Sequence, residues 1–374
     1  MKFPNTAFLL DSAPRTWSSQ EDRHLAICQS LIEAGSRPVL IFSGPLPADM
    51  HQRFMNAGVP VETANYERGV WQFYKALKKI FQEYEIKRVH AIFFDYFRAV
   101  GWITRLAGAK SVVYEMQNGG VFRATSWKRQ IIRLRNRIMT APFVRIIAIS
   151  EYIKGQLIEG GVPGQKIVVR HLGIDTTRFR PNKQQREQLA KQFGVEAGEM
   201  ILSTVSYLRP IKNPQLIVQA CGELAKRGTR AHLFVAGDGE MLEELQQLSA
   251  ELGISDRAHW LGLVPDPTSL LQASDAFLLA TVGEAFGLVL AESMACGVPV
   301  VGARAGAISE VVAHGETGVL VDPWSAHALA NGIETLAMDP ALHSRMAKQA
   351  IDRVANHFSL TKAVDETLAI HYAL

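Results

Sequence analysis

Short apolar runs alternate with amphipathic helical stretches along almost the whole chain. In the first half, apolar runs such as Ala7–Leu10, Val89–Phe94 and Val144–Ile149 are separated by stretches with helical periodicity, such as Asp22–Ala34 and Val70–Tyr84. This alternation is typical of right-handed βαβ units, in which helices cover both faces of a parallel sheet. The sequence therefore predicts an α/β fold.

The second half repeats the pattern, with apolar runs that include Ile201–Ser206, Ala276–Leu279 and Gly318–Val321. A chain of 374 residues is long for one compact core, so two domains are expected. We predict two Rossmann-like domains that face each other across a cleft, residues 1–178 and residues 179–358. Ligands of such sheets bind at the carboxyl ends of the strands, so the site is expected in that cleft.

The composition favours a soluble cytoplasmic protein. Hydrophobic residues make up 48% of the chain and charged residues 20%, which is ordinary for a globular protein. No apolar run approaches the roughly 20 residues of a membrane span, and Asp11 interrupts the first apolar run too early for a signal peptide. The three cysteines lie far apart in the sequence and are interpreted as small core residues in a reducing compartment.

The charge is unevenly distributed. Residues 1–180 hold 26 Lys and Arg against 14 Asp and Glu, whereas residues 181–374 hold 14 against 22. Either the two halves meet different partners, or the basic half complements the acidic half across the cleft.

Several common catalytic motifs are absent from the sequence. There is no Walker A motif, no G-x-G-x-x-G fingerprint opening a helix and no G-x-S-x-G elbow, and Gly237-Asp238-Gly239 follows a predicted strand without completing a dinucleotide motif. No His, Cys and Asp cluster has the spacing of metal ligands. We therefore expect no metal and no bound cofactor.

Two glutamates mark the most informative segment. Glu284 lies in a loop before a predicted helix and Glu292 lies eight residues later, within that helix. The start of a helix presents backbone N–H groups and a partial positive charge, which suits a phosphate or a sugar hydroxyl. Glu292 can accept hydrogen bonds from a diol such as a ribose. The alternative is that both glutamates belong to a solvated helix face.

The segment from Glu284 to Pro299 resembles the E-x7-E signature of retaining glycosyltransferases of family 4, which have the GT-B fold. Other segments follow in the order of that family, closely over about residues 150–330 and loosely before them. These segments are Ile149–Ser150, Gly161–Pro163, Val169–Asp175, Arg178–Pro181, Val205–Lys212, Ala236–Gly239, Leu261–Val264 and Gly315–Val321.

The resemblance implies a two-domain GT-B fold in which the C-terminal helix, residues 359–374, returns to the first domain. It places Glu284 against the donor sugar and gives the ribose hydroxyls to Glu292. The backbone N–H groups of Phe286, Gly287 and Leu288 would hold sugar hydroxyls, and the backbone near Val264 would meet the base.

Arg209 and Lys212 are the candidate cations for the leaving phosphate. Cleavage of a sugar–diphosphate bond builds negative charge on the phosphate, and without a metal that charge needs cations or backbone dipoles. Arg offers a planar fork for phosphate oxygens and Lys a point charge. The alternative interpretation is a solvated turn in which Pro210 fixes the backbone.

Three positions depart from the family pattern. Ser206-Tyr207-Leu208 replaces the common Gly-Arg-Leu, so that Arg209 follows two places later. Ser18 and Ser19 replace a glycine pair, where their hydroxyls could approach a phosphate. Gln117 stands at or beside the position of a histidine near the reacting sugar, and a glutamine cannot carry a proton.

A basic amphipathic helix is predicted around residues 123–137. Trp127, Ile131, Leu134 and Ile138 share one face, and no acidic residue lies between Glu115 and Glu151. The helix could lie on anionic lipid, collect a phosphate-bearing acceptor, or pack on its sheet through the apolar face with its arginines in water. The residues of this candidate patch are Arg123, Trp127, Lys128, Arg129, Arg133 and Arg137.

We predict a retaining, metal-independent glycosyltransferase. It would move a hexose-type sugar from a nucleotide diphosphate donor, UDP- or GDP-linked, to a sugar or lipid-linked acceptor held by the first domain. An anionic membrane surface on the cytoplasmic side is a further expected partner, and nucleic acid is not. The alternatives are a phosphorylase or nucleotide-sugar hydrolase that uses the same cleft, and a non-catalytic nucleotide-sugar-binding or membrane-associated scaffold.

Overall fold

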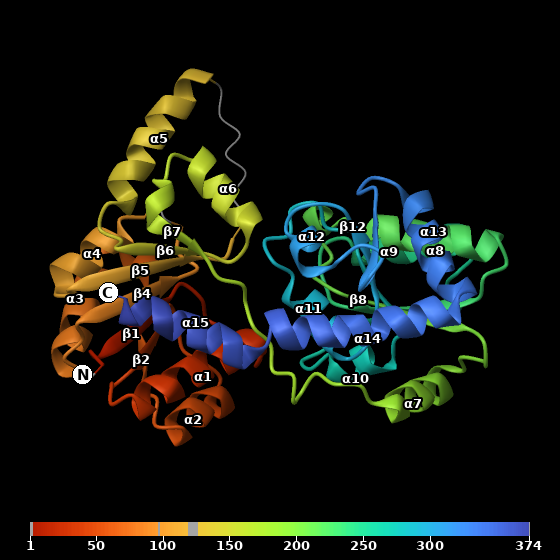
Figure 1. Cartoon of the computed structure of the whole chain (residues 1–374), viewed down its shortest axis with the longest axis horizontal. Helices are drawn as coiled ribbons and strands as arrows, with labels where there is room; N and C mark the ends of the chain where they lie inside the picture. The colour runs from red at the N-terminus through yellow and green to blue at the C-terminus, as the bar shows by residue number, and fades with distance from the viewer. Residues whose placement is uncertain (1–2, 96–97, 119–125, 374) are drawn as a thin grey trace. The chain divides into compact units, whose positions relative to one another are not determined.

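The chain forms two compact units (Figure 1). The computed structural model describes residues 3–95, 98–118 and 126–373. Unit 1 comprises Met1–Gly173 together with Leu360–Leu374, and unit 2 comprises Ile174–Ser359. The sequence prediction put the boundary at residues 178 and 179, a few residues further along the chain.

Unit 1 is built on a parallel sheet. Among its described residues seven strands pair in the order β3-β2-β1-β4-β5-β6-β7. From β1 the chain adds β2 and β3 on one side of the sheet, and then β4 to β7 on the other side. The carboxyl ends of β1 and β4 therefore form a topological switch point. The strands are β1 (Thr6–Leu10), β2 (Val39–Phe42), β3 (Val61–Thr63), β4 (Arg88–Ile92), β5 (Ser111–Met116), β6 (Arg145–Ala148) and β7 (Ile167–Val169).

Helices cover this sheet. Apolar residues of α1, α2 and α15 share one buried cluster with β1, β2 and β4, while α4 packs on β4 and β5. The C-terminal helix α15 therefore belongs to unit 1. The helices are α1 (Ser19–Glu33), α2 (Ala48–Asn56), η1 (Tyr66–Arg68), α3 (Val70–Glu83), α4 (Val100–Ala107), α5 (Ser126–Thr140), α6 (Glu151–Glu159), η2 (Gly164–Lys166) and α15 (Leu360–Tyr372).

Unit 2 has a second parallel sheet. Its described strands pair in the order β10-β9-β8-β11-β12-β13. From β8 the chain adds β9 and β10 on one side, and then β11, β12 and β13 on the other side of β8. The switch point therefore lies between β8 and β11. The strands are β8 (Met200–Val205), β9 (Ala231–Ala236), β10 (Ala258–Gly262), β11 (Ala276–Leu279), β12 (Val300–Ala303) and β13 (Gly318–Val321).

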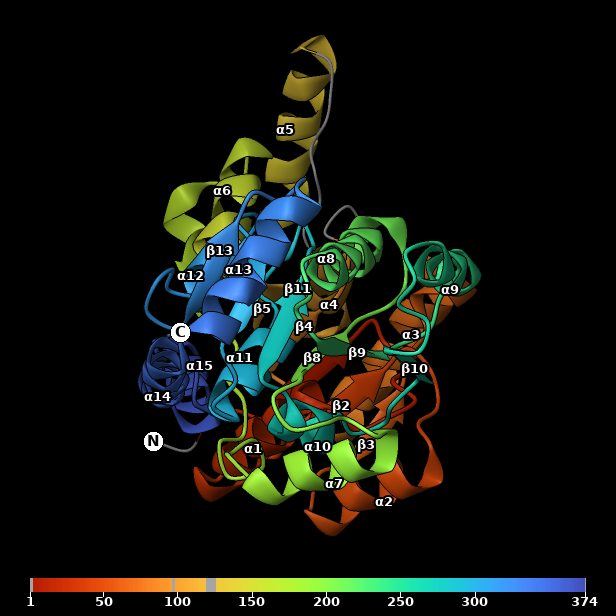
Figure 2. The ribbon, with the colours of Figure 1, turned by 90° about the vertical axis from the view of Figure 1, so that its right-hand side faces the viewer.

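The helices of unit 2 lie on both faces of its sheet (Figure 2). Helices α8, α9 and α13 bury a cluster against one face, and α7 and α10 lie on the other. The helices are α7 (Lys183–Phe193), η3 (Pro210–Lys212), α8 (Pro214–Lys226), α9 (Leu242–Glu251), α10 (Thr268–Ala273), α11 (Leu288–Ala295), α12 (Ile308–Val311), α13 (Ala326–Met338) and α14 (Pro340–His357).

The predicted α/β class with two Rossmann-like domains is confirmed. Two elements that the sequence did not predict have weak apolar signals. Strand β3 is three residues long and none of them is fully buried, and α7 contains no buried residue. An element with no fully buried residue leaves only a weak periodicity to detect.

Candidate functional site

The loops that follow β8 and β11 meet at the switch point of unit 2. Lys212 ends the short helix η3 after β8, and Glu284 lies in the loop after β11. The Lys212 ammonium donates to Glu284 Oε2 at 2.9 Å. The two side chains are 28% and 15% exposed, so the pair is partly shielded but still open to solvent. A crevice at this place in a parallel sheet is where α/β proteins bind ligands.

Arg209 lies in the same loop as Lys212 but is more exposed. It precedes η3 in an extended conformation, and its guanidinium carbon lies 5.6 Å from the centre of the Tyr207 ring. Tyr207 is itself 63% exposed. The structure therefore supplies two cations in one loop, one engaged by Glu284 and one at the surface.

The loop after β8 packs closely on the loop after β9. Leu208 donates its N–H to Asp238 O and accepts from the N–H of Met241 at its own carbonyl. A Cβ on Gly239 would lie 2.5 Å from Leu208 O, so the close approach requires glycine there. This packing fixes the course of the segment that carries Arg209 and Lys212.

Helix α11 begins at Leu288, shortly after Glu284. Gly287 precedes its first residue with φ +86°, a left-handed conformation that favours glycine. Phe286 is buried, and its ring packs edge-to-face on Phe358 with centroids 5.6 Å apart. The first turn, from Leu288, presents N–H groups that have no partner within the helix. These groups and the partial positive charge of the helix start lie beside Glu284.

Glu292 lies one turn further along α11. It is 8% exposed among neighbours that are also buried, and its charge contributes to the raised pKa of the Cys296 thiol, about 12, of which burial is the main cause. A carboxylate with so little water around it needs polar partners.

Val264 follows β10 and packs half-buried against a cluster that includes Phe234 and Ala236 of β9.

The other predicted donor-site residues belong to unit 1. Ser18 is the N-cap of α1: its hydroxyl accepts from Gln20 N–H and donates to Glu21 Oε2 at 2.5 Å. Ser19 is the first residue of α1 and is 3% exposed. Ser18 therefore has a role in starting the helix that requires no ligand.

Gln117 follows β5 and is 6% exposed. Its amide nitrogen donates to Glu115 Oε1 at 2.5 Å, and its carbonyl accepts from the Gln20 amide at 2.7 Å. The side chain is thus held at both ends, between β5 and α1. The structure groups the predicted residues into two sets, with Ser18, Ser19 and Gln117 in unit 1 and the other donor-site residues in unit 2.

Glu115 lies at the centre of a buried polar cluster in unit 1 that the sequence analysis did not identify. Arg170 Nη2 donates to Glu115 Oε2 at 2.5 Å and Arg23 Nη1 donates to the same oxygen at 3.1 Å. His90 Nε2 lies 3.2 Å from that oxygen. We call this group the Glu115 cluster; its members are Glu115, Arg23, Arg170, His24, His90 and His371.

The Glu115 cluster joins the C-terminal helix to the sheet. His90 Nδ1 lies 3.1 Å from Nε2 of His371 on α15, and Arg88 donates to the His371 carbonyl at 2.5 Å. A carboxylate within an apolar parallel strand such as β5 is the sequence signal that would have indicated this cluster.

The protonation states in the cluster follow from its charges and burial. Burial alone would raise the pKa of Glu115, but the charges of Arg170 and Arg23 hold it well below its usual range. Burial and the charge of Arg23 hold the pKa of His24 well below 6.5. The cluster therefore contains an ionised carboxylate and a neutral His24 at neutral pH.

The pKa values of the other two histidines are lowered as well. Burial lowers the pKa of His90, against the attraction of Glu115. Burial, followed by the charge of His90, holds the pKa of His371 well below its usual range.

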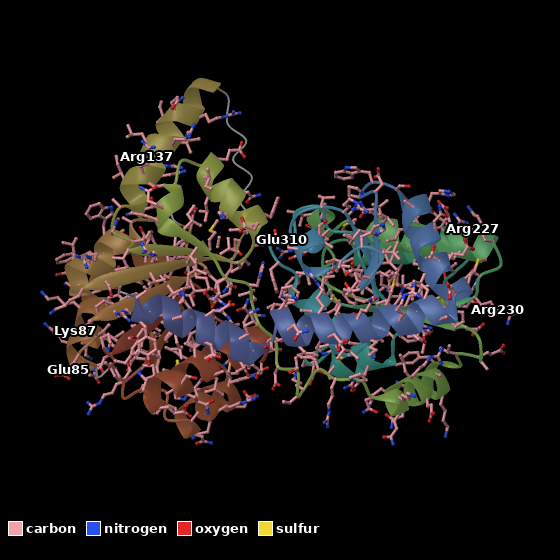
Figure 3. The ribbon with its side chains drawn as sticks, viewed as in Figure 1. Glu85, Lys87, Arg137, Arg227, Arg230 and Glu310 are labelled. Atoms are coloured by element: carbon pink, nitrogen blue, oxygen red, sulfur yellow. The ribbon has the colours of Figure 1, made fainter. Side chains whose placement is uncertain are left out.

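The predicted basic patch lies on α5. Arg123 lies outside the described residues, and so do the side chains of Trp127 and Lys128. Arg129, Arg133 and Arg137 are exposed on α5; Arg137 is labelled in Figure 3. The interpretation that this helix packs on its sheet through the predicted apolar face is wrong. Ile131, Leu134 and Ile138 are 61%, 62% and 51% exposed, and the helix packs through another face.

Among the described residues, no group of three His, Cys, Asp or Glu side chains is arranged to hold a metal ion. The same part of the chain contains no helix with the length and hydropathy needed to cross a membrane.

Family models match both halves of the chain. The model described as Glycosyltransferase Family 4 matches residues 24–178, and the model described as Glycosyl transferases group 1 matches residues 185–353. The second match includes the switch point of unit 2, between β8 and β11. The chain belongs to glycosyltransferase family 4.

Curated relatives of this family 4 member match it in part. An N-acetyl-α-D-glucosaminyl L-malate synthase of Bacillus anthracis is 37% identical over 190 residues, 51% of this chain and 50% of that protein. A D-inositol 3-phosphate glycosyltransferase of Thermomonospora curvata is 29% identical over 73% of this chain and 68% of that protein. The matched segment spans half the length of the first relative.

Solved structures show that the family 4 member has the GT-B fold. The structure of HepE from Anabaena in complex with UDP has a TM-score of 0.84, with 22% identity over 99% of this chain and all of that chain. A sucrose-phosphate synthase from Thermosynechococcus elongatus has a TM-score of 0.78, with 19% identity over 99% of this chain and 98% of that one.

Proposed function

We propose that this family 4 member transfers a hexose-type sugar from a nucleotide diphosphate donor to an acceptor hydroxyl, with retention of anomeric configuration and without a metal ion. The observation that carries the proposal is the Lys212–Glu284 pair at the switch point of unit 2, beside the start of α11. The UDP bound in HepE of Anabaena and the sugar-transferring names of the relatives support the same reaction.

Each side of the site has a role in this proposal. Lys212 and Arg209 stabilise the negative charge that grows on the leaving diphosphate. Glu284 and the backbone of Phe286, Gly287 and Leu288 hold the sugar hydroxyls. Glu292 accepts hydrogen bonds from the ribose, and the backbone at Val264 meets the base, with uracil or guanine as the proposed bases.

The reaction breaks the bond between the anomeric carbon and the diphosphate oxygen. The acceptor oxygen bonds to the same face of that carbon, and the acceptor proton passes to the leaving phosphate oxygen. No side chain needs to carry this proton, so Gln117 in place of a histidine is compatible with the transfer. We propose that Ser18, Ser19 and Gln117 also bind the donor.

We propose that the acceptor binds at the carboxyl ends of β2 and β3 in unit 1. A cavity of about 200 Å³ opens there, and its lining includes the polar side chains of Ser43, Thr63, Asn65, Arg68 and Gln72. These groups suit a hydroxyl-rich acceptor, either a free sugar or the sugar of a lipid-linked molecule. For a lipid-linked acceptor, we propose that the enzyme works on the cytoplasmic side of a membrane with an anionic surface.

The test is calorimetric titration of UDP-, GDP-, ADP- and TDP-sugars into wild-type protein and Glu292→Ala, with a chelator present. Loss of a hydrogen bond to a charged group should weaken donor binding by about 1.5–3 kcal/mol, roughly tenfold to a hundredfold. Glu187→Ala on α7, an exposed carboxylate of unit 2, is the matched control and should bind normally.

Binding that is equal in wild type and Glu292→Ala would contradict the assignment of Glu292. Tight binding of a donor without turnover across many acceptors would favour the non-catalytic scaffold. Sugar release that depends on inorganic phosphate would identify a phosphorylase.

A further inference from the structure

Helix α5 packs on unit 1 through one face, and a different, apolar face is exposed. Asn136 and Thr140 are buried, with Ile132 and Met139 half-buried beside them. The Asn136 amide donates to Gly160 O at 2.7 Å. These residues recur at intervals of three and four and therefore define the packed face.

The C-terminal half of α5 is firmly attached. A Cβ on Gly161 would lie 2.7 Å from Arg133 Cβ, so the glycine allows the two backbones to approach. The Lys166 ammonium donates to the carbonyls of Ala141 and Phe143 just beyond the end of the helix, at 2.9 and 3.0 Å, where a cation also favours the helix dipole. In Figure 1 and Figure 2 the other end of α5 extends away from the sheet of unit 1.

The apolar face of α5 is exposed. Ile131, Leu134 and Ile138 recur at intervals of three and four on the side nearly opposite to Asn136, because successive residues turn by about 100°. Each of the three side chains is more than half exposed. Scattered exposed apolar residues are ordinary, but three in one row on a projecting helix are not.

Arginines flank this exposed row on both sides. By the same helical rotation, Arg133 and Arg137 lie along one side of the row and Arg135 along the other, and all three are exposed. The segment between Glu115 and Glu151 contains no acidic residue. An apolar row bordered by cations is the pattern of a helix that lies in a membrane interface.

The apolar surface continues onto α4. Trp102 and Leu106 stand one turn apart on α4 and are 44% and 73% exposed. The Trp102 indole N–H donates to the Ile138 carbonyl at 3.1 Å, which joins the two helices at this surface. Beside the arginines, a cavity of about 540 Å³ is lined by Arg133, Arg137 and the backbone around Gly161.

We propose that this surface docks on an anionic lipid bilayer, with the row of Ile131, Leu134 and Ile138 inserted among the lipids and the arginines at the level of the headgroup phosphates. The cavity beside Arg133 and Arg137 is the place for such a phosphate. The proposal rests on the proposed function in one respect, since a docked enzyme would be held near a lipid-linked acceptor.

The charge of the surface selects this occupant. In a symmetric dimer with α5 against α5, the arginines of the two copies would repel each other. Nucleic acid would meet the arginines but leave the apolar row unused. An anionic bilayer matches both features, because its headgroups attract the arginines and its acyl chains accept the apolar side chains.

The test is flotation of the full chain with vesicles of phosphatidylcholine alone and of phosphatidylcholine mixed with phosphatidylglycerol. The wild type should float with the mixed vesicles and much less with the neutral ones. The triple variant Arg133→Gln, Arg135→Gln, Arg137→Gln should lower the partition coefficient at least about tenfold. The triple variant Ile131→Ser, Leu134→Ser, Ile138→Ser should lower it by a similar factor even at low salt.

Two control proteins carry the same chemical changes elsewhere. Lys183→Gln, Lys191→Gln, Lys226→Gln removes three exposed charges from unit 2. Met55→Ser, Trp324→Ser, Met338→Ser removes three apolar side chains that are each at least 45% exposed. Both controls should float as the wild type does, and all five proteins should show the same urea unfolding midpoint.

Equal flotation with neutral and anionic vesicles, or an equal loss in the controls, would overturn the proposal. So would a dimer in light scattering that the Ile131, Leu134 and Ile138 variant dissociates, or displacement of the protein from vesicles by nucleic acid. Donor titration is independent of these readouts. Donor binding without flotation would refute the docking surface alone, and flotation without donor binding would refute the proposed transfer alone.

Discussion

At the scale of single residues, the Lys212–Glu284 pair shows how the proposed donor site can be held ready for a charged ligand. The ammonium and the carboxylate lie 2.9 Å apart across the switch point, so each neutralises the other before a donor arrives. A diphosphate would compete with Glu284 for the ammonium and release the carboxylate for sugar hydroxyls. The pair is therefore suited to a ligand that carries both groups.

Substitution of either partner should affect binding more than folding. We expect Lys212→Met and Glu284→Gln each to change the free energy of unfolding by less than about 1 kcal/mol, because partly exposed ion pairs contribute little. Lys212→Met should weaken donor binding roughly tenfold, since a hydrogen bond to a charged phosphate is lost. Urea titration and calorimetry measure the two effects, with Lys226→Met as the control. Unchanged donor affinity in Lys212→Met would exclude this lysine from the site.

The sequence predicted the positions of these residues but not their pairing. Glu284 and Lys212 were assigned to loops after strands, and the structure places both there. Their contact joins residues that are 72 apart in the chain, which no local pattern contains. Ser18 illustrates the opposite difficulty, because a serine before a helix has the same appearance as a cap and as a phosphate ligand.

At the scale of elements, α5 shows what periodicity can and cannot determine. The spacing of Ile131, Leu134 and Ile138 correctly groups them on one face. The spacing does not determine whether that face is buried, because a different face of the helix can pack on the protein instead. Here the Asn136 amide nitrogen donates to the Gly160 carbonyl and the Thr140 hydroxyl donates to the Asn136 carbonyl, so polar residues occupy the packed face and apolar ones remain outside.

Strand β5 carries the carboxylate that connects several elements of unit 1. Glu115→Gln would leave Arg23 and Arg170, each 1% exposed, without a buried counter-charge. Removal of one partner of such a buried ion pair costs about 3–5 kcal/mol, and we expect a loss of that size in urea unfolding. The exposed Glu159→Gln on α6 is the control and should be neutral.

Hydrogen exchange gives a second measurement on the same variant. Because His90 of β4 contacts both Glu115 and His371, amides of α15 should exchange faster in Glu115→Gln. If the stability of Glu115→Gln stayed within about 1 kcal/mol of the wild type, the cluster would not hold these elements together.

At the scale of the whole molecule, the alternation of strands and helices was sufficient to predict two parallel sheets. Buried parallel strands are apolar along their length, and that signal survives without any knowledge of topology. The strand order and the Glu115 cluster are set by contacts between distant segments. The sequence therefore predicts which residues form the cores of the units better than it predicts which charged residues are buried within them.

The buried histidines should make unit 1 lose stability in mild acid. Because the folded-state pKa values of His24, His90 and His371 lie below 6.5, the unfolded chain takes up protons first as the pH falls through 6.5. The stabilising contribution of the three neutral histidines is present above pH 6.5. It is lost as the pH falls towards their folded-state pKa values. The pKa of Glu115 is lowered far enough that its contribution should persist until stronger acid.

The two units should therefore respond differently to pH. Between neutral pH and about pH 5, where imidazoles of ordinary pKa titrate, we expect the opening free energy of β1 and β4 to fall more than that of β8 and β11. Hydrogen exchange followed by mass spectrometry resolves these strands separately. In unit 2, burial also lowers the pKa of His259, but that ring is half-buried and should contribute less. An equal loss in both units would show that the three buried histidines do not control the acid sensitivity of unit 1.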